Sequence, residues 1–381
     1  MKEYKLSQLL EIKNGKDHKE LPDGEYPVFG SGGVMRFVNE YLYDKPSILL
    51  PRKGSLDNIQ YCDVPFWTVD TLYYTVVNEE LANPYFLYRY LKLLDLSRLD
   101  SGTGVPSMTF DSYYGIKVML PKIEEQKRIA SVLQKLDAKI KLNCQINDNL
   151  EAMAKQLYDY WFVQFDFPNE ECKPYKSSGG TMVWNEKLKR EIPQGWIDCN
   201  LKDFINLFDS KRVPLSSKDR GERHGIYPYY GATGIMDYVN DYIFDGDYIL
   251  LAEDGSTSDG KGFPIVQYIW GKNWVNNHAH IILPKNEQYT MFTYQMLRSI
   301  PAKQIETGSI QKKISQENLC GYKIALPYSD LMERYENIVS PLWEKRKCCF
   351  EEINALTKQR EELLPLLMNG QATVNYHLSA Y

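Results

Sequence analysis

Two stretches of this chain are nearly the same. Residues 26–35 read YPVFGSGGVM, and residues 227–236 read YPYYGATGIM, at an offset of 201 residues (227 minus 26). Farther along, residues 115–121 match residues 321–327 at an offset of 206 (321 minus 115). Repeats of roughly 20–50 residues indicate a solenoid, whereas a repeat as long as this one indicates a duplicated domain.

Each copy of the repeat is rich in β-forming stretches that Gly, Pro, Asn and Asp interrupt, a pattern typical of short strands and turns. In the first copy, residues 84–99 have a helical pattern, with Asn83 in the N-cap position and Pro84 in the first turn. The mixture predicts modules of the α+β class. We expect the first module over residues 1–121 and the second over residues 192–327.

A long helical segment follows each module, over residues 122–165 and 328–371. Apolar residues recur in these segments at steps of four and three, as in a coiled-coil seam. The predicted seam residues are Leu133, Leu136, Ile140, Leu150 and Leu157 in the first segment and Ile353, Leu356 and Leu363 in the second. A helix of about 40 residues is about 60 Å long and cannot be buried within one compact domain. We therefore expect two long antiparallel helices that pair as a coiled coil and relate the two modules by an approximate two-fold axis.

Polar residues and prolines interrupt these segments. Asn143 and Asn147 lie in the seam, where a buried Asn fixes register and an exposed Asn in a loosely paired stretch is equally compatible with the pattern. Pro341 and Pro365 are unfavourable inside a helix, so the second helix is predicted to bend or break near Pro341. Residues 166–191 are polar and contain SSGG, which predicts a linker.

The composition is that of a globular protein of 381 residues, with 25% charged and 43% hydrophobic residues and a net charge of −5. No apolar run approaches the roughly 18–20 residues of a membrane span, and the first residues lack the apolar core of a signal peptide. The seven cysteines form no C-x-x-C pair, which favours reduced thiols in a cytoplasmic protein. The net charge argues weakly against a DNA partner, although a clamp with a basic inner surface and acidic outer surfaces would have the same balance.

The motifs that resemble catalytic sites are incomplete. The sequence NPYF at residues 83–86 resembles the amino-methyltransferase motif, but its second proline is missing and no glycine-rich cofactor loop precedes it. The glycine-rich stretches fit neither a P-loop nor a dinucleotide fingerprint. His278 and His280 lack the Cys or carboxylate pattern of a metal site and are interpreted as strand histidines. We therefore expect no catalytic residue, no metal and no cofactor.

Five segments carry a resemblance to a known family. They are SGTGVPS at 101–107, LPKIEEQKRI at 120–129, WFVQF at 161–165, IPQGW at 192–196 and LLPLLMNG at 363–370. In this order, around a duplicated module, they resemble the specificity (S) subunit of type I restriction-modification systems, HsdS. The second copy departs from the pattern, because it has GSIQKK at 308–313 in place of the first segment, and its helix lacks the EEQ start.

The resemblance implies a subunit that is not itself an enzyme. Residues 1–121 and 192–327 would be target-recognition domains, each reading one half of an asymmetric, bipartite site in double-stranded DNA. The two helices would set the gap between the half-sites and dock the partner subunits. Those partners would be two modification (methyltransferase) subunits and, in the full complex, restriction subunits. Two unlike modules on a spacer also fit a bipartite site on physical grounds, since the spacing of DNA readers matches the spacing of half-sites.

Basic and hydroxyl side chains in the glycine-punctuated loops are the candidate DNA contacts, because Arg and Lys bind phosphates and guanine while Ser and Thr serve either. The candidates in module one are Lys16, Arg36, Arg52, Lys53, Ser55, Ser107 and Thr109. The candidates in module two are Lys211, Arg212, Lys218, Arg220, Lys261, Lys312 and Lys313.

Two other functions remain open on the sequence alone. One is a stand-alone adenine DNA methyltransferase, which requires a cofactor fold. The other is a coiled-coil scaffold whose heads bind a ligand other than DNA, which would retain no DNA in a sequence-dependent way.

Overall fold

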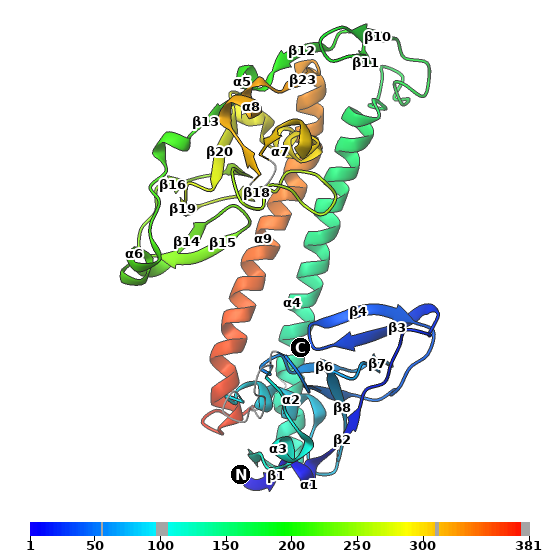
Figure 1. Ribbon diagram of the computed structural model, residues 1–381, viewed down its shortest axis with the longest axis vertical. Helices are drawn as coiled ribbons and strands as arrows, with labels where there is room; N and C mark the ends of the chain where they lie inside the picture. The colour runs from blue at the N-terminus through cyan, green and yellow to red at the C-terminus, as the bar shows by residue number, and fades with distance from the viewer. Residues whose placement is uncertain (55, 97–105, 309–311, 375–381) are drawn as a thin grey trace, which may run out of the picture. The chain divides into compact units, whose positions relative to one another are not determined.

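The computed structural model describes residues 1–54, 56–96, 106–308 and 312–374 (Figure 1). It divides into two compact units. Unit 1 consists of Met1–Cys144 and Phe350–Tyr381, and unit 2 consists of Gln145–Cys349. Each unit therefore holds one module of the repeat together with one part of each long helix.

The sheets of unit 1 are small and mostly antiparallel. A four-stranded sheet has the order β2 (Leu10–Asn14), β8 (Leu72–Val77), β5 (Ser47–Pro51) and β6 (Gln60–Cys62). A three-stranded sheet has the order β4 (Gly33–Val38), β3 (Asp23–Gly30) and β7 (Trp67–Thr68). β3 and β4 form an antiparallel hairpin, and β7 runs parallel to β3. A third sheet pairs β1 (Lys2–Lys5) with β9 (Lys117–Leu120).

Unit 2 repeats this order of strands. One sheet has the order β13 (Ile205–Leu207), β20 (Ala279–Pro284), β17 (Tyr248–Ala252) and β18 (Val266–Ile269). The next has the order β15 (Ile235–Val239), β14 (His224–Tyr230), β19 (Lys272–Val275) and β16 (Phe244–Asp245). β12 (Ile197–Asn200) pairs with β23 (Lys323–Leu326), and β21 (Glu306–Thr307) pairs with β22 (Lys313–Ile314). β14 again runs parallel to its short neighbour β19, so the two modules share one topology.

Short helices recur in unit 2, two of them at the offset of 206 residues and the first at an offset of 195 (201 minus 6). Unit 1 has α1 (Leu6–Leu9), α2 (Pro84–Lys92) and α3 (Phe110–Tyr114). Unit 2 has α5 (Leu201–Phe204), α6 (Ser217–Glu222), α7 (Thr290–Ser299) and α8 (Gln316–Gly321). The predicted N-cap of α2 is confirmed, since the Asn83 side chain accepts a hydrogen bond of 3.0 Å from the Phe86 amide. α2 ends at Lys92, short of the predicted end at residue 99.

The two long helices are α4 (Ile123–Tyr158), which continues as a π-helical turn over Asp159–Val163, and α9 (Ser329–Met368). The predicted break near Pro341 is wrong, because α9 is continuous through that residue. Val339 and Trp343 flank the proline and are 0% and 1% exposed. Their packing in the core holds the helix although the proline removes one backbone hydrogen bond.

Each unit buries parts of both long helices in one core. In unit 1 the core includes Leu133 of α4 together with Leu364 and Leu367 of α9, and the predicted seam residues Leu136 and Leu363 pack against it. The other seam residues Ile140, Leu150, Leu157, Ile353 and Leu356 are half-buried. Within each unit, α4 and α9 are therefore packing partners.

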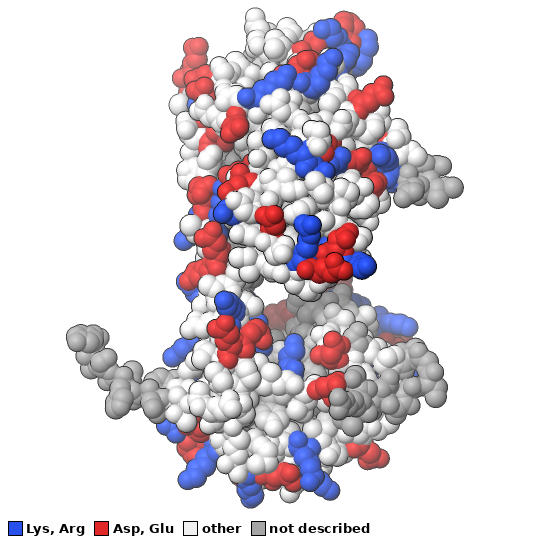
Figure 2. All heavy atoms as spheres, turned by 90° about the vertical axis from the view of Figure 1, so that its left-hand side faces the viewer, with Lys and Arg blue, Asp and Glu red and all other residues white. Residues whose placement is uncertain are grey.

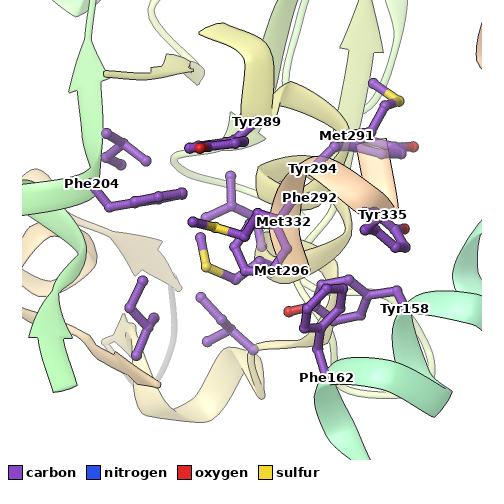
Figure 3. Close-up of a cluster of buried hydrophobic side chains, with 14 of the residues drawn as sticks. Tyr158, Phe162, Phe204, Tyr289, Met291, Phe292, Tyr294, Met296, Met332 and Tyr335 are labelled. Carbon is purple, nitrogen blue, oxygen red and sulfur yellow. The ribbon is translucent and has the colours of Figure 1, made fainter. Parts of the chain in front are cut away.

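The core of unit 2 is aromatic where α4, α7 and α9 meet. Figure 3 shows Tyr158 and Phe162 of α4 and its π-helical turn, Phe292 of α7 and Tyr335 of α9 directed toward one another. The rings of Phe162 and Phe292 lie 4.9 Å apart, and those of Phe162 and Tyr335 lie 5.1 Å apart, both nearly edge to face. This geometry suits aromatic pairs and fixes the module against the helices.

The segment predicted as a linker, residues 166–191, is ordered, and that interpretation is corrected. β10 (Met182–Asn185) and β11 (Arg190–Pro193) form a hairpin within and just beyond it. Phe167 is 1% exposed and stacks on Trp196 at 5.7 Å, and Asp166 accepts hydrogen bonds from the Ser177 amide and hydroxyl. The polar composition concealed a few aromatic anchors that join the core of unit 2.

Candidate nucleic-acid interface

The hairpins β3–β4 and β14–β15 have the same irregularity at the same place. Their registers shift between Asp23 and Tyr26 in the first and between His224 and Tyr227 in the second. At the shift, a Cβ on Gly24 would lie 2.4 Å from the Asn39 Cα, and one on Gly225 would lie 2.3 Å from the Asn240 Cα. Glycine is required at both positions because the backbones approach too closely for a side chain.

The tips of these hairpins are held by matching hydrogen bonds. The Gln60 side chain donates to the Gly30 carbonyl at 2.9 Å, and the Gln267 side chain donates to the Gly231 carbonyl at 3.1 Å. Gln60 lies in β6 and Gln267 lies in the equivalent strand β18, so the same contact recurs in both modules. The repeated sequence therefore specifies a rigid hairpin of one design, used twice.

In module one, two predicted loops are brought together beside the end of β5. The Gly54 amide donates to the Pro106 carbonyl at 3.0 Å, the Met108 amide donates to the Arg52 carbonyl at 3.0 Å, and Lys53 forms a bridge with Ser107. The Lys53 side chain is exposed and has no ion pair among the described residues. The four predicted contacts Arg52, Lys53, Ser107 and Thr109 thus come from one neighbourhood. The Thr109 side chain caps α3, and Ser55 and residues 101–105 lie outside the described residues.

In module two the charges of this neighbourhood are inverted. At the offset of 201, Arg52 and Lys53 correspond to Glu253 and Asp254. Lys313 stands where module one has Ser107, and its Nζ lies 3.1 Å from a Glu253 carboxylate oxygen. The two modules therefore present different charges on one scaffold, as two readers of different base sequences require. Sequence comparison of the two copies contained this signal.

A buried polar network lies beneath the loops of module two. Arg212 lies 2.7 Å from a Glu253 oxygen and 3.6 Å from an Asp209 oxygen, and its side chain is 13% exposed. The His280 ring lies 2.6 Å from an Asp209 carboxylate oxygen through Nδ1 and 2.8 Å from the Ile314 carbonyl through Nε2, so both ring nitrogens have hydrogen-bond partners. Burial raises the pKa of Asp209, but hydrogen bonds from His280 and the Ile281 amide outweigh it, so the pKa lies below its ordinary value.

Asp209, Glu253 and His280 have the ligand types of a metal site, and their ligand atoms lie within 4.8 Å of one another. Arg212 already pairs with both carboxylates, and Gln316 donates to Asp209 at 2.6 Å. The carboxylate charge is therefore balanced within the protein. Arg212, which was predicted to contact DNA, is therefore part of this buried network and not of an exposed surface.

His278 lies in the turn before β20, so its interpretation as a strand histidine is wrong. Its Nδ1 lies 2.6 Å from the Asp254 carboxylate, and its side chain is 47% exposed. No partner of its Nε2 is found among the described residues. An oriented, exposed imidazole of this kind can donate a hydrogen bond to a phosphate, and it can donate to a base or accept from one.

The remaining predicted contacts divide by whether they are paired. Arg36 pairs with Asp23, Arg220 pairs with Asp237, and Lys312 lies 3.0 Å from Glu306. By contrast, a further group has no ion pair within the part of the chain that the structure describes: Lys16, Lys211, Lys218 and Lys261. These four lysines are exposed, and Lys211 also lies 5.1 Å from the centre of the Phe208 ring.

Both hairpins also expose the same apolar stripe. Val34, Met35 and Phe37 of β4 are 51–60% exposed. Their equivalents in β15, Ile235, Met236 and Tyr238, are 41–55% exposed. In unit 2, a groove of about 820 Å³ runs between α4 and α9, with Met153, Leu157, Ile338 and Leu342 on its walls. Exposed apolar patches of this kind mark contact surfaces for other proteins.

Basic and acidic side chains alternate over the face shown in Figure 2, without one continuous basic band. Within the described residues, no helix is long and apolar enough to span a membrane.

The comparisons with known proteins agree with this architecture. A family model, "Type I restriction modification DNA specificity domain", matches residues 1–152 and 193–334, which include both modules, most of α4 and the beginning of α9. The chain belongs to this family. One relative is the type I restriction enzyme MjaIX specificity subunit of Methanocaldococcus jannaschii. It is 23% identical to this chain, and the alignment covers 87% of this chain and 79% of the relative. The HindI specificity subunit of Haemophilus influenzae is 22% identical over 81% of this chain and 82% of its own length.

A solved structure of the family shows the same fold. The S subunit of a type I restriction-modification system from M. genitalium aligns over 96% of both chains with a TM-score of 0.63 at 19% identity. The predicted fold class, two similar recognition domains joined by two long antiparallel helices, is confirmed. The chain is a type I specificity subunit, and its part in the complex is recognition of DNA rather than catalysis.

Proposed function

We propose that each target-recognition domain of this specificity subunit reads one half of an asymmetric, bipartite DNA site. The observation that carries the proposal is the shared hairpin scaffold with inverted loop charge. Module one offers Lys53 beside Ser107, whereas module two offers Lys313, Asp254 and His278 at equivalent places. Lys donates to guanine and phosphate, Asp accepts from cytosine, and His can do either, so two different base patterns follow from these loops.

The domain boundaries belong to the same proposal. We assign residues 1–121 and 192–327 to the recognition domains, and residues 122–165 and 328–371 to the helices that set the gap. Residues 166–191 form the arm between α4 and the second domain. The DNA contacts are proposed at the loops of both domains, with the unpaired lysines as phosphate contacts because exposed, uncommitted charges bind phosphate without losing an internal partner.

A partner subunit that is present in two copies would bind a surface that both modules have in common. The apolar stripes of β4 and β15 are repeated, and we propose that one modification subunit docks against each stripe. Restriction subunits would join through this assembly. We place the complex in the cytoplasm, where cellular DNA is found and where the chain's free thiols remain reduced.

The direct test exchanges one domain. Residues 1–121 are replaced with the corresponding domain of a relative, the chimera is expressed with the modification subunit, and methylated adenines are mapped in the genome. We expect one half of the methylated motif to change and the other half to persist. A motif that changes in both halves, or in neither, would refute independent reading. A complex that retains DNA without sequence preference would favour a scaffold with another ligand.

A further inference from the structure

In each unit, a single carboxylate on α4 holds two arginines. In unit 1, Asp137 lies 2.8 Å from Arg360 of α9 and also pairs with Arg89 of α2. In unit 2, Glu151 lies 2.5 Å from Arg346 of α9 and 2.8 Å from Arg298 of α7. We name these groups the Asp137 cluster and the Glu151 cluster. Each one ties the two long helices to each other and to the recognition module.

The long helices align at the offset of 206 residues, because α4 starts at Ile123 and α9 starts at Ser329. The alignment extends to their far ends, where Tyr158, Trp161 and Phe162 correspond to Leu364, Leu367 and Met368. All six of these side chains are buried. Equivalent positions in the two helices can therefore be compared one by one.

The two clusters do not occupy equivalent positions. Asp137 and Arg360 correspond to Trp343 and Ala154, and Glu151 and Arg346 correspond to Thr357 and Ile140. Each cluster thus exists at one end of the helix pair only.

The position of Arg89 in α2 is also filled differently in α7. Its equivalent is Gln295, which is 1% exposed. Within the described part of unit 2, neither the Gln295 amide nor the Trp343 Nε1 has a hydrogen-bond partner. The ion pair between Arg89 and Asp137 therefore has no counterpart there.

The result is a segregation of charge between the helices. Both carboxylates lie on α4, and both arginines of the helix pair lie on α9. A pair of two C-terminal halves would place Arg346 and Arg360 opposite Thr357 and Trp343, respectively, with no carboxylate from either cluster. Arg360 would keep Glu361, its neighbour on α9 at 2.6 Å, but would lose Asp137. The side chains of Arg346 and Arg360 are 24% and 18% exposed, so water would compensate the lost partners poorly.

A pair of two N-terminal halves loses less. Asp137 would keep Arg89, and Glu151 could meet Lys92, the equivalent of Arg298, but both carboxylates would lack the arginine from α9. A third pair between the helices, Lys139 with Glu352 at 3.3 Å, has the opposite polarity. Its side chains are 48% and 45% exposed, and exposed pairs contribute little to affinity.

We infer that this charge segregation makes α4 select α9, so that each half of the chain recognises the other half rather than a second copy of itself. A like-with-like pair would carry two identical recognition domains and would read a two-fold symmetric site, as symmetric DNA readers do. The charges therefore protect the asymmetry of the site. The inference concerns the choice of helix partner and holds whatever DNA sequence each domain reads.

The test begins with the full chain. A site for a specific protease is placed between Glu170 and Glu171, which are exposed, and the folded protein is cut there so that both halves remain present. Two preparations with different tags are denatured, mixed and refolded, and pairs are counted by native mass spectrometry. We expect unlike pairs to exceed the proportion of random pairing by about ten-fold or more. Halves that pair in random proportions would overturn the inference.

The cause is tested with matched variants. Arg346→Met with Arg360→Met should lower the preference for unlike pairs by about ten-fold and should raise the share of C-terminal pairs in particular. Lys139→Met, which removes the exposed pair of opposite polarity, should leave the preference unchanged. A preference that survives the double substitution would show that apolar packing, not charge, selects the partner. If the double variant does not refold, each single substitution should still lower the preference measurably, and no change in either would overturn the inference.

Discussion

At the scale of single residues, the two recognition domains differ by charge at positions whose backbone is the same. Arg36 of β4 pairs with Asp23, whereas its equivalent Asp237 has the opposite charge and pairs with Arg220 of α6, a residue that does not correspond to Asp23. Lys53 and its equivalent Asp254 also carry opposite charges. Reversals of this kind change what a surface attracts while they leave the scaffold stable.

The Lys53 side chain gives the clearest residue-scale prediction. Lys53→Gln should weaken DNA binding for all sequences and lower the slope of log K against log salt by up to about one unit, because one phosphate contact is lost. The measurement is a salt titration of DNA binding by the assembled complex. Lys45→Gln is the matched control, since Lys45 is also exposed but precedes β5, whereas Lys53 follows it. Equal slopes for wild type and Lys53→Gln would remove Lys53 from the interface.

At the scale of elements, the two modules cap their equivalent helices differently. α2 uses its own Asn83, whereas the N-cap residue of α7 supplies no side-chain hydrogen bond. Instead, Glu336 of α9 accepts a hydrogen bond of 2.7 Å from the Phe292 amide in the first turn of α7. Burial raises the pKa of Glu336 to about 7, although hydrogen bonds from Phe292 and Ser340 oppose the rise. A docking contact has therefore taken the place of a local cap.

This carboxyl predicts a dependence of stability on pH. Its pKa in the folded state exceeds the ordinary value of 4.5, so the folded state binds more protons between pH 4.5 and about 7. Stability should fall as pH rises through that window, and Glu336→Gln should remove this part of the fall. At pH 8 the variant should be more stable than wild type by roughly 2–3 kcal/mol, measured by urea unfolding at pH 5.5 and pH 8. Glu351→Gln, an exposed position on α9, is the control, and a variant with an unchanged pH profile would contradict the assignment.

At the scale of the whole molecule, the helices are proposed to set the gap between the half-sites. Inserting one heptad into each long helix keeps the seam in phase and adds about 10 Å. On DNA this corresponds to about three base pairs and also rotates one half-site by roughly a quarter turn. We expect methylation at a motif with a longer gap, at reduced activity. Mapping the methylated motif of the variant tests this, and an active variant that keeps the original gap would show that other elements set the spacing.

The sequence by itself determined the features that repeat. Period and offset predicted two modules and two long helices, because a duplicated core must bury the same apolar positions twice, and a heptad seam needs a partner helix. The cap at Asn83 and the glycines of the hairpins were also predictable, since local backbone geometry dictates them. DNA recognition was predicted from the family resemblance, whose segments follow one another in the family's order along the two repeated units.

Only the tertiary structure decided what depends on partners distant in sequence. Arg212 looks like a loop cation in the sequence, but its side chain is largely buried and lies 2.7 Å from a Glu253 oxygen, so this charge is neutralised inside the protein. Pro341 stays within a continuous helix because packing of the core around Trp343 stabilises the helix by more than the loss of one backbone hydrogen bond costs. Residues 166–191 are ordered because Phe167 stacks on Trp196. The pairing of Asp137 and Glu151 with arginines of α9 likewise required the fold, because complementarity between side chains about 200 residues apart leaves no periodic signal in the chain.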